Sequence, residues 1–246
     1  MVRRFVGVLA VAGLALQSGA QGIVGDWPDL RKYIVIQSDF YGVAAAGGLL
    51  VASSSGAGTG CLPVSIDGGY GIWECSSGTT ITGQSGLSGV GAIQLGIGAV
   101  YYEDRVQVSD LSDGTETFVW IGGLSDTLTD SGVDAVGFRY AHTEQGGEFV
   151  CYTRSNSTES TADSNVAVAA DTWYRRSLVV NAAGTLATFS INGASVCGAG
   201  ITTNIPTGFS RTTALIPQNI IKSAGTTARL VDIDYVSFVQ ILATAR

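Results

Sequence analysis

The ionisable side chains best placed for chemistry fall on two neighbouring expected strands. Glu148, Tyr152 and Arg154 stand at alternate positions of one strand, so their side chains are expected on one face. Arg139 belongs to the preceding expected strand, and His142 lies just after it. His142 could act as a general base, although a single histidine after a strand is more often an ordinary loop residue. Arg–Glu pairs across neighbouring strands are also common as surface pairing, so the group has a structural explanation as well.

Carboxylate pairs offer a second kind of chemistry, since glycoside hydrolysis needs two carboxyl groups about 5–10 Å apart. Asp232 and Asp234 share one face of the expected last strand. Glu103 and Asp104 are adjacent, so they point to opposite faces, and we expect both to be solvated. The sequence has no Gly-x-Ser-x-Gly motif and a single histidine, which argues against a Ser-His-Asp hydrolase.

One expected loop carries candidate metal ligands. Asp126, Asp130 and Asp134 could bind Ca2+, which prefers oxygen ligands. Their spacing lacks the Gly and Glu of a defined calcium-binding loop, so the motif is weak. The sequence predicts no other cofactor.

Aromatic rings are the candidates for stacking on the apolar faces of sugars. Tyr101 and Tyr102 are adjacent in an expected strand, so they point to opposite faces and one of them is expected to be exposed. Trp120 and Tyr140 alternate with phenylalanines, which indicates core positions.

Four cysteines, Cys61, Cys75, Cys151 and Cys197, suit two disulfides. Cys61 and Cys75 are close in sequence and flank a turn-rich Asp-Gly-Gly segment, so we expect them to pair. That leaves Cys151 with Cys197, both in expected strands, for which buried free thiols are the alternative. Neither spacing resembles a zinc site.

Composition excludes several classes of protein. The chain has 246 residues, of which 46% are hydrophobic and 13% are charged, so it is not intrinsically disordered. With 13 basic and 20 acidic residues, it has no basic patch to follow a phosphate backbone, and we expect no nucleic-acid partner.

The first twenty residues differ from the rest. Arg3 and Arg4 precede an apolar run from Phe5 to Leu16, and small residues follow up to Ala20. This pattern predicts a signal peptide over residues 1–20, and the apolar run is too short to span a bilayer. The alternative is an apolar arm that anchors the protein to a partner. Residues 21–30 are expected to be a lead-in segment.

A succession of short strands must position all these side chains. Alternating patterns occur near Val100 and in the stretches Tyr33–Gln37, Glu116–Ile121, Val133–Tyr140, Glu148–Arg154, Trp173–Asn181, Leu186–Asn192 and Leu230–Ile241. Asp-Gly and Asn-Gly pairs between them predict tight hairpin turns. The Gly/Ala/Ser-rich stretches at 42–60 and 76–91 are expected to be loops or loosely patterned edge strands.

No long stretch after residue 30 shows helical spacing of apolar residues. The sequence therefore predicts an all-β fold, a two-sheet antiparallel jelly-roll sandwich, with residues 31–246 as a single domain.

The last 75 residues or so carry a family resemblance. Trp173-Tyr174 opens a strand that runs through Leu178–Asn181, and the next strand ends at the turn Asn192-Gly193. The closing strand Val231–Val236 has an Ile-Asp-x-Val pattern. Together these features resemble concanavalin A-like jelly rolls, including laminin-G-like domains. The resemblance implies the fold more than an activity.

A looser resemblance points elsewhere. The segment from Asp39 to Leu49, the loop Ser77–Thr80, the turn Leu111-Ser112 and the terminal Ala243–Arg246 are similar in texture to fibre and head-decoration proteins of tailed phages.

The jelly-roll resemblance also implies where enzymes of that fold would keep their residues. Its glycosidases carry a Glu-x-Asp-x-x-Glu type motif, which this sequence lacks, and Asp232 and Asp234 match positions that tie loops together. Its lyases use Tyr, His, Arg and Gln on the concave sheet to neutralise a uronate and move its proton. The group around Tyr152 is the best match to that arrangement, but no lyase motif is present.

We therefore expect a non-enzymatic virion structural protein, a phage head-decoration or fibre component that exposes its jelly roll on the virion surface. Its expected partners are other virion or capsid proteins, further copies of itself, and glycans on a host surface. One alternative is a secreted, extracellular carbohydrate-binding lectin, and a second is a polysaccharide lyase or glycosidase. The candidate ligand-binding residues are Tyr101, Tyr102, Arg139, His142, Glu148, Tyr152 and Arg154.

Overall fold

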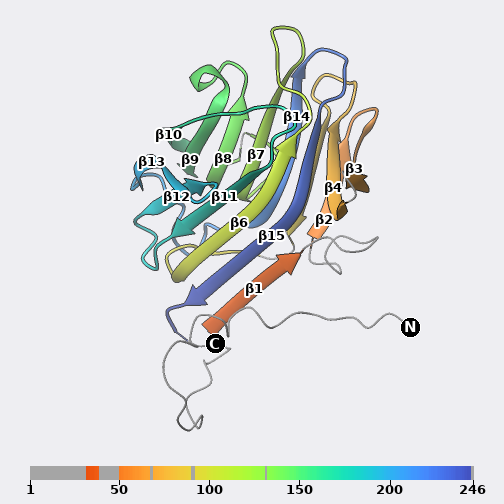
Figure 1. Ribbon diagram of the computed structural model, residues 1–246. Helices are drawn as coiled ribbons and strands as arrows, with labels where there is room; N and C mark the ends of the chain where they lie inside the picture. The colour runs from red at the N-terminus through yellow and green to blue at the C-terminus, as the bar shows by residue number, and fades with distance from the viewer. Residues whose placement is uncertain (1–31, 39–49, 67–68, 90–91, 131, 245–246) are drawn as a thin grey trace, which may run out of the picture. The chain divides into compact units, whose positions relative to one another are not determined.

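The computed structural model describes residues 32–38, 50–66, 69–89, 92–130 and 132–244 (Figure 1). The expected signal or anchoring segment 1–20, the lead-in 21–30 and the segment from Asp39 to Leu49 lie outside these residues. The described part contains no α-helix, and no helix in it is long and apolar enough to cross a membrane. The prediction of an all-β chain is confirmed.

The strands form two antiparallel sheets. Sheet A has the order β13 (Ala194–Ile201), β12 (Ala187–Ile191), β11 (Tyr174–Val180), β6 (Gly98–Val108), β15 (Leu230–Leu242), β4 (Gly69–Ser77) and β3 (Thr59–Ile66). A further strand, β1 (Tyr33–Ser38), runs antiparallel beside the C-terminal half of β15 (Figure 1).

Sheet B carries the second layer. Its order is β10 (Thr158–Ala167), β9 (Glu148–Ser155), β8 (Ala135–Ala141), β7 (Thr117–Ser125), β14 (Ala214–Ala224), β5 (Gln84–Gly89) and β2 (Leu50–Ser55). The 3-10 turn Gln145–Gly147 precedes β9. The Gly/Ser-rich segments expected as loops or edge strands thus supply β5 and the edge strand β2.

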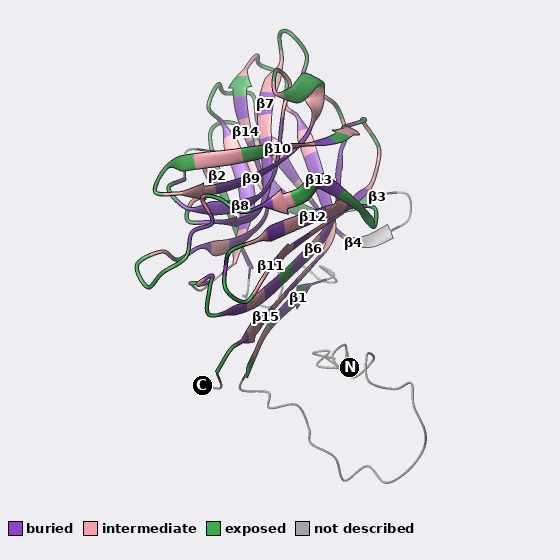
Figure 2. Cartoon of the chain, turned by 90° about the vertical axis from the view of Figure 1, so that its left-hand side faces the viewer, coloured by how far each residue is buried: buried purple, intermediate pink, exposed green. Residues whose placement is uncertain are grey.

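The core lies between the sheets because each strand turns alternate side chains inward. Val100 and Val106 of β6 face Trp120 and Phe138 of sheet B within one apolar cluster. Figure 2 shows buried residues along the strands of both sheets and exposed residues concentrated in the loops. The core positions expected for Trp120 and Tyr140 are confirmed.

The core also contains a charged pair. Arg176 and Asp104 are both 0% exposed, and Arg176 Nε donates to Asp104 Oδ1 at 3.1 Å. Tyr102 donates its hydroxyl proton to the same carboxylate, and the guanidinium carbon of Arg176 lies 4.8 Å from the centre of the Trp120 ring. The expectation that Asp104 is solvated was therefore wrong: Glu103 and Asp104 do point to opposite faces, but Asp104 points inward to a buried arginine.

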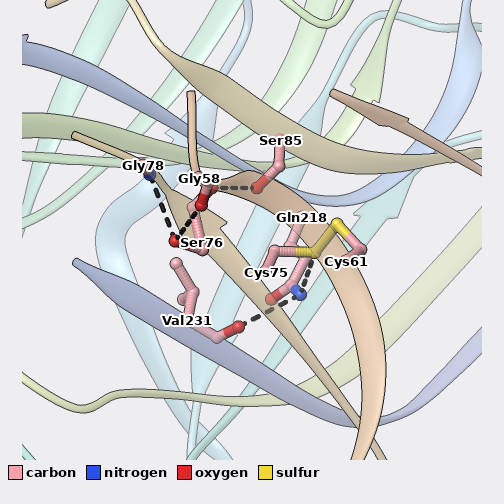
Figure 3. The surroundings of a disulfide bond; sticks show 8 residues. All are labelled: Gly58, Cys61, Cys75, Ser76, Gly78, Ser85, Gln218 and Val231. Carbon is pink, nitrogen blue, oxygen red and sulfur yellow. Dashed lines mark hydrogen bonds between the residues drawn. A yellow bond between two sulfur atoms is a disulfide. The ribbon is translucent and has the colours of Figure 1, made fainter. Parts of the chain in front are cut away.

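Two disulfides connect the strands, in the pairing expected from the sequence. Cys61 is joined to Cys75 at directly opposed positions of β3 and β4, as Figure 3 shows. Gln218 of sheet B reaches across and donates to Cys75 Sγ at 3.1 Å. Cys151 of β9 is joined to Cys197 of β13, so this disulfide links sheet B to sheet A. No cysteine is left as a free thiol.

Turns with positive φ close two of the hairpins. Asn192 and Gly193, with φ of 53° and 82°, join β12 to β13, as the Asn-Gly pair predicted. Asn156 and Ser157, with φ of 54° and 63°, join β9 to β10 in the same way. This second turn fixes the register of the strands that carry the candidate site.

Candidate functional site

The outer face of sheet B, the face turned away from the core, carries buried side chains that the core does not use. In β9, Phe149 and Cys151 belong to the core, so the alternate residues Val150 and Tyr152 point the other way. Both are nevertheless buried, and Tyr152 is 3% exposed. An outer face is buried in this way when another part of the chain lies over it.

The connection between β7 and β8 lies over this face. Arg154 of β9 donates Nη1 to the main-chain oxygens of Asp130 and Gly132, the latter at 3.1 Å. Asn219 of β14 donates to the main-chain oxygen of Leu128. These hydrogen bonds hold the described parts of the connection, 126–130 and 132–134, against two strands of sheet B, β9 and β14.

Arg139 lies at the centre of the covered region and is 7% exposed. It donates Nε and Nη2 to the two carboxylate oxygens of Glu144, at 2.7 and 2.5 Å. It also donates Nη1 and Nη2 to Glu159 of β10, both at 2.9 Å. A third carboxylate, that of Asp130, lies 3.3 Å from Nη1. Such bidentate contacts fix the plane of a guanidinium group.

Glu159 connects the two arginines. It lies directly opposite Arg154 in the β9–β10 ladder and accepts from Arg154 Nε at 3.0 Å while it also binds Arg139. The Tyr152 ring packs against both cations, since its centre is 5.2 Å from the guanidinium carbon of Arg139 and 5.7 Å from that of Arg154. We call Arg139, Tyr152, Arg154, Asp130, Glu144 and Glu159 the guanidinium cluster.

The surroundings shift the pKa values of two carboxyl groups of this cluster in opposite directions. Burial disfavours the charged form of Glu159, but its hydrogen bonds to Arg139 and Arg154 outweigh burial and lower its pKa. For Asp130 the balance is reversed, and burial raises its pKa despite the two nearby arginines. Burial also raises the pKa of the Tyr152 phenol, and the charge of Asp130 adds to this effect.

The structure brings together three of the seven predicted ligand-binding residues, namely Arg139, Tyr152 and Arg154. Glu148 shares their face but lies beside Asp163, whose carboxyl group raises the pKa of Glu148. His142 lies beyond the end of β8, near Asp113 rather than the cluster.

The two tyrosines predicted as sugar-stacking candidates lie on sheet A. Tyr101 is 44% exposed on its outer face, so one of the adjacent pair is exposed, as expected. Tyr102 is bound to Asp104 in the core and is not accessible to a ligand.

The sequence did not single out Glu144 and Glu159. Glu159 could have been found from the two-residue turn at Asn156-Ser157, because that turn sets the register that places it opposite Arg154.

The three loop aspartates do not converge on a metal. Asp126 accepts from the Val133 amide at 3.1 Å, Asp134 accepts from Arg211 at 2.7 Å, and Asp130 faces the guanidinium cluster. Within the described residues, no group of three or more His, Cys, Asp or Glu side chains is arranged to hold a metal ion.

The two aspartates of the last strand have separate surroundings. Asp234 forms an ion pair with Arg105 of β6 at 2.6 Å. Asp232 is 2% exposed, and burial raises its pKa to about 7, helped by the charges of Glu74 and Asp171. Asp232 and Asp234 therefore do not form a pair of carboxylates that a substrate could reach together.

A shallow cleft adjoins the cluster. Its lining includes Ile121, Gly123, Ile216 and Tyr152, and it has no enclosed space for a water molecule. Small-molecule pockets are usually about 300 Å3 or larger, so this depression is not a small-molecule pocket.

Comparison with known proteins shows a family. A family model described as "SO2946-like, C-terminal domain" matches residues 69–234 of this chain. No curated protein matches.

Solved structures show the fold. A protein of unknown function, SO2946, from Shewanella oneidensis MR-1 is 16% identical with a TM-score of 0.61, over 87% of this chain and 89% of that one. Peanut lectin, solved with a 9mer peptide, is 7% identical with a TM-score of 0.58, over 86% and 99%. A prokaryotic β-1,3-1,4-glucanase (lichenase) from a mouse hindgut metagenome is 13% identical with a TM-score of 0.55, over 84% and 98%.

These likenesses establish a concanavalin A-like jelly roll, as the sequence motifs implied. The fold is shared by lectins, which bind, and glucanases, which hydrolyse, so the fold does not decide between binding and catalysis. That decision depends on the residues of the outer face of sheet B.

Proposed function

The chain belongs to the SO2946-like C-terminal domain family, and from its jelly-roll fold and its guanidinium cluster we propose that it is an exported, non-catalytic glycan-binding protein. The observation that carries the proposal is the pair of arginines packed against Tyr152 on the outer face of sheet B. Fixed guanidinium groups present several hydrogen-bond donors in a set geometry, which suits the oxygen atoms of a sugar, and the buried Tyr152 ring holds them in place.

The ionisation of the cluster supports binding over catalysis. A general acid or base works best with a pKa near the working pH. The Tyr152 phenol has its pKa raised, so it is a poor base, and Glu159 has its pKa lowered, so it is a poor acid. Both Glu144 and Glu159 are engaged with arginine, which leaves neither as a nucleophile.

The disulfides support export. Cys61–Cys75 and Cys151–Cys197 are the kind of crosslink found in proteins that meet an oxidising compartment. Attachment to a virion, capsid partners and assembly of several copies remain predictions from the sequence, as does Ca2+ binding.

A glycan array tests the proposal. We expect the purified protein to bind a defined set of glycans, and Arg154→Gln to weaken that binding at least about tenfold, since a charge-assisted hydrogen bond is lost. The matched control is Arg105→Gln, which removes an arginine with one carboxylate partner on the other sheet. Thermal unfolding of both variants distinguishes loss of a contact from loss of the fold.

Two results would overturn the proposal. One is a folded wild-type protein that binds no glycan on the array. The other is release of reducing ends or unsaturated sugars from a polysaccharide panel, abolished by Tyr152→Phe, which would establish an enzyme instead.

A further inference from the structure

Three polar side chains form a row across the outer face of sheet A. Gln107 of β6 and Glu74 of β4 stand directly opposite Asp232 of β15, which lies between those two strands (Figure 1). The neighbours of each residue along its own strand belong to the core, so all three side chains point away from it. Directly opposed residues have Cβ atoms about 4.5–5.5 Å apart, so the three polar ends can meet around one point.

This row contains buried oxygen atoms that lack a hydrogen-bond donor. Gln107 is 7% exposed, and its Oε1 atom has no hydrogen-bond partner among the described residues. The same holds for Oδ1 of Asp232, which is 2% exposed. Both atoms are acceptors, so neither can satisfy the other. Because buried acceptors without a partner are costly, a group from solvent is expected between them.

The charge around Asp232 is negative and uncompensated. The other two buried aspartates of the described chain each form an ion pair with an arginine. Asp232 has no arginine or lysine partner in that part of the chain, and the nearby charges that act on it are those of Glu74 and Asp171. Burial raises the pKa of Asp232, and these two negative charges raise it further. Water at this place would meet the two acceptors but leave the charge uncompensated, whereas a cation would do both.

We propose that Glu74, Gln107 and Asp232 bind a Ca2+ ion on the outer face of sheet A. Ca2+ takes about six to eight oxygen ligands, among them carboxylates, amide oxygens and water. Gln107 Oε1 and Asp232 Oδ1 are the buried ligands, and the half-buried Glu74 adds a second carboxylate next to solvent. Mg2+ fits this set less well because it demands a nearly ideal octahedron and gives up its water reluctantly.

The segment before β11 adds charge beside the ion. The Asp171 main-chain N–H donates to the Val108 main-chain oxygen at 2.8 Å, next to Gln107, which holds the segment against the end of β6. Within the described residues, no three His, Cys, Asp or Glu side chains are arranged around one ion, so Asp171 contributes charge and not a ligand. The ion would thus connect three strands of sheet A and attract this segment to them.

The site is independent of the proposed glycan binding, because it lies on the sheet that does not carry the guanidinium cluster. In the cation-free protein, a proton on Asp232 can relieve part of the excess of acceptors. Proton and Ca2+ then compete for the same carboxylate, so the ion is best tested at pH 8.

Calorimetric titration of CaCl2 into the purified, chelator-treated protein tests the site. We expect one ion to bind per chain with a Kd of about 0.1–1 mM, the range of extracellular calcium-binding modules. Tm should be higher in CaCl2 than in EDTA, because the ion binds the folded chain. Asp232→Asn and Glu74→Gln should each weaken binding at least about tenfold, since a charged ligand is lost, and reduce the rise in Tm.

Gln107→Glu gives effects of opposite sign in the two conditions. In EDTA it adds a fourth negative charge to the group and should lower Tm. It should nevertheless strengthen Ca2+ binding at least about threefold, because the affinity of such sites rises with the charge of their ligands. A lower Tm without tighter binding would mean that water or a proton, and not a cation, fills this place.

Asp234→Asn is the matched control. Asp234 lies two residues further along β15, but its carboxylate already forms an ion pair with Arg105 at 2.6 Å. It should bind Ca2+ as wild type does. Absence of saturable binding up to about 10 mM CaCl2, or binding that Asp232→Asn leaves intact, would overturn the site. Loss of binding in Asp234→Asn with retention in Glu74→Gln would also overturn it.

Discussion

At the scale of single residues, Asp232 shows how a buried carboxyl group couples stability to pH. Its Oδ1 atom is buried without a hydrogen-bond partner, and so is the Oε1 atom of Gln107, which lies opposite it in the ladder. Both atoms are acceptors when Asp232 is ionised. A proton on Asp232 turns one of them into a donor, which agrees with a pKa raised to about 7.

The first prediction concerns this proton. Because the folded-state pKa lies above the ordinary value of 3.8, the folded state binds the proton more tightly than the unfolded chain. Stability should therefore fall as pH rises from about 4 to about 7. Asp232→Asn keeps the shape without the charge and should be about 1–3 kcal/mol more stable than wild type at pH 8. Urea unfolding at pH 4, 6 and 8 measures this.

Asp234→Asn serves as its control, because that carboxylate has Arg105 as a partner. If wild type and Asp232→Asn have the same free energy of unfolding at pH 8, the buried carboxylate is tolerated in its charged form and the explanation is wrong.

At the scale of single residues, the sequence predicted part of the site. The period of two placed Tyr152 and Arg154 on one face, because that period follows from strand geometry alone. The contact of Asp130 with Arg139 was not predicted, because the path of the β7–β8 connection over sheet B is a tertiary feature. The partner of Asp104 was missed for the same reason: Arg176 comes from a strand 72 residues away.

At the scale of elements, β7 contains a close approach that no side chain can enter. A Cβ atom on Gly122 would lie 2.3 Å from Arg176 Nη2 and 2.8 Å from the main-chain oxygen of Pro217. Arg176 cannot move aside without leaving Asp104. The glycine at this position therefore makes room for the buried ion pair.

Gly122→Ala should accordingly destabilise the fold by about 3–5 kcal/mol, the usual cost of breaking one side of a buried ion pair. Gly114→Ala is the matched control, since a Cβ there has nothing within 4 Å. Chemical denaturation of both variants gives the comparison, and a similar small loss in each would show that the pair adapts to the methyl group.

Element prediction succeeded where side chains alternate and failed where they are small. The strands from Glu148 and from Trp173 were expected because apolar and polar residues alternate there. Strands β5 and β2 consist largely of Gly and Ser, which carry little periodic signal. They form because β14 offers backbone groups to β5, and β5 in turn offers backbone groups to β2. The polar strand β10 was missed as well, since it is an edge strand with few apolar residues.

At the scale of the whole molecule, the two disulfides act on different parts of the unfolded chain. Cys151–Cys197 closes a loop with a sequence separation of 46, and Cys61–Cys75 closes one of 14. In the chain-entropy account, the longer loop contributes about 4 kcal/mol and the shorter about 3 kcal/mol.

We therefore expect the double variant Cys151→Ala/Cys197→Ala to lose more stability than Cys61→Ala/Cys75→Ala, by about 1 kcal/mol. Urea unfolding of the two variants and wild type under oxidising conditions measures the difference. The reverse order would mean that the contacts of Cys75 with Gln218 outweigh chain entropy.

The overall architecture was accessible from sequence because it depends on patterns repeated along the chain. Similarity to solved structures at 7–16% identity shows how little residue identity the same sandwich requires. Such folds tolerate exchange of core residues that keep volume and pattern. Function depends on a few positions and was therefore harder to infer.

The Cys151–Cys197 crosslink would also govern how the protein responds to mechanical load. If the domain were stretched between its ends, the segment between the two cysteines, whose sequence separation is 46, could not extend, even after both sheets had separated. At about 3.5 Å per extended residue, roughly 160 Å of contour length would stay locked. A tether built from this domain would therefore extend less by that length while oxidised, which single-molecule pulling with and without reductant would reveal as a step in length.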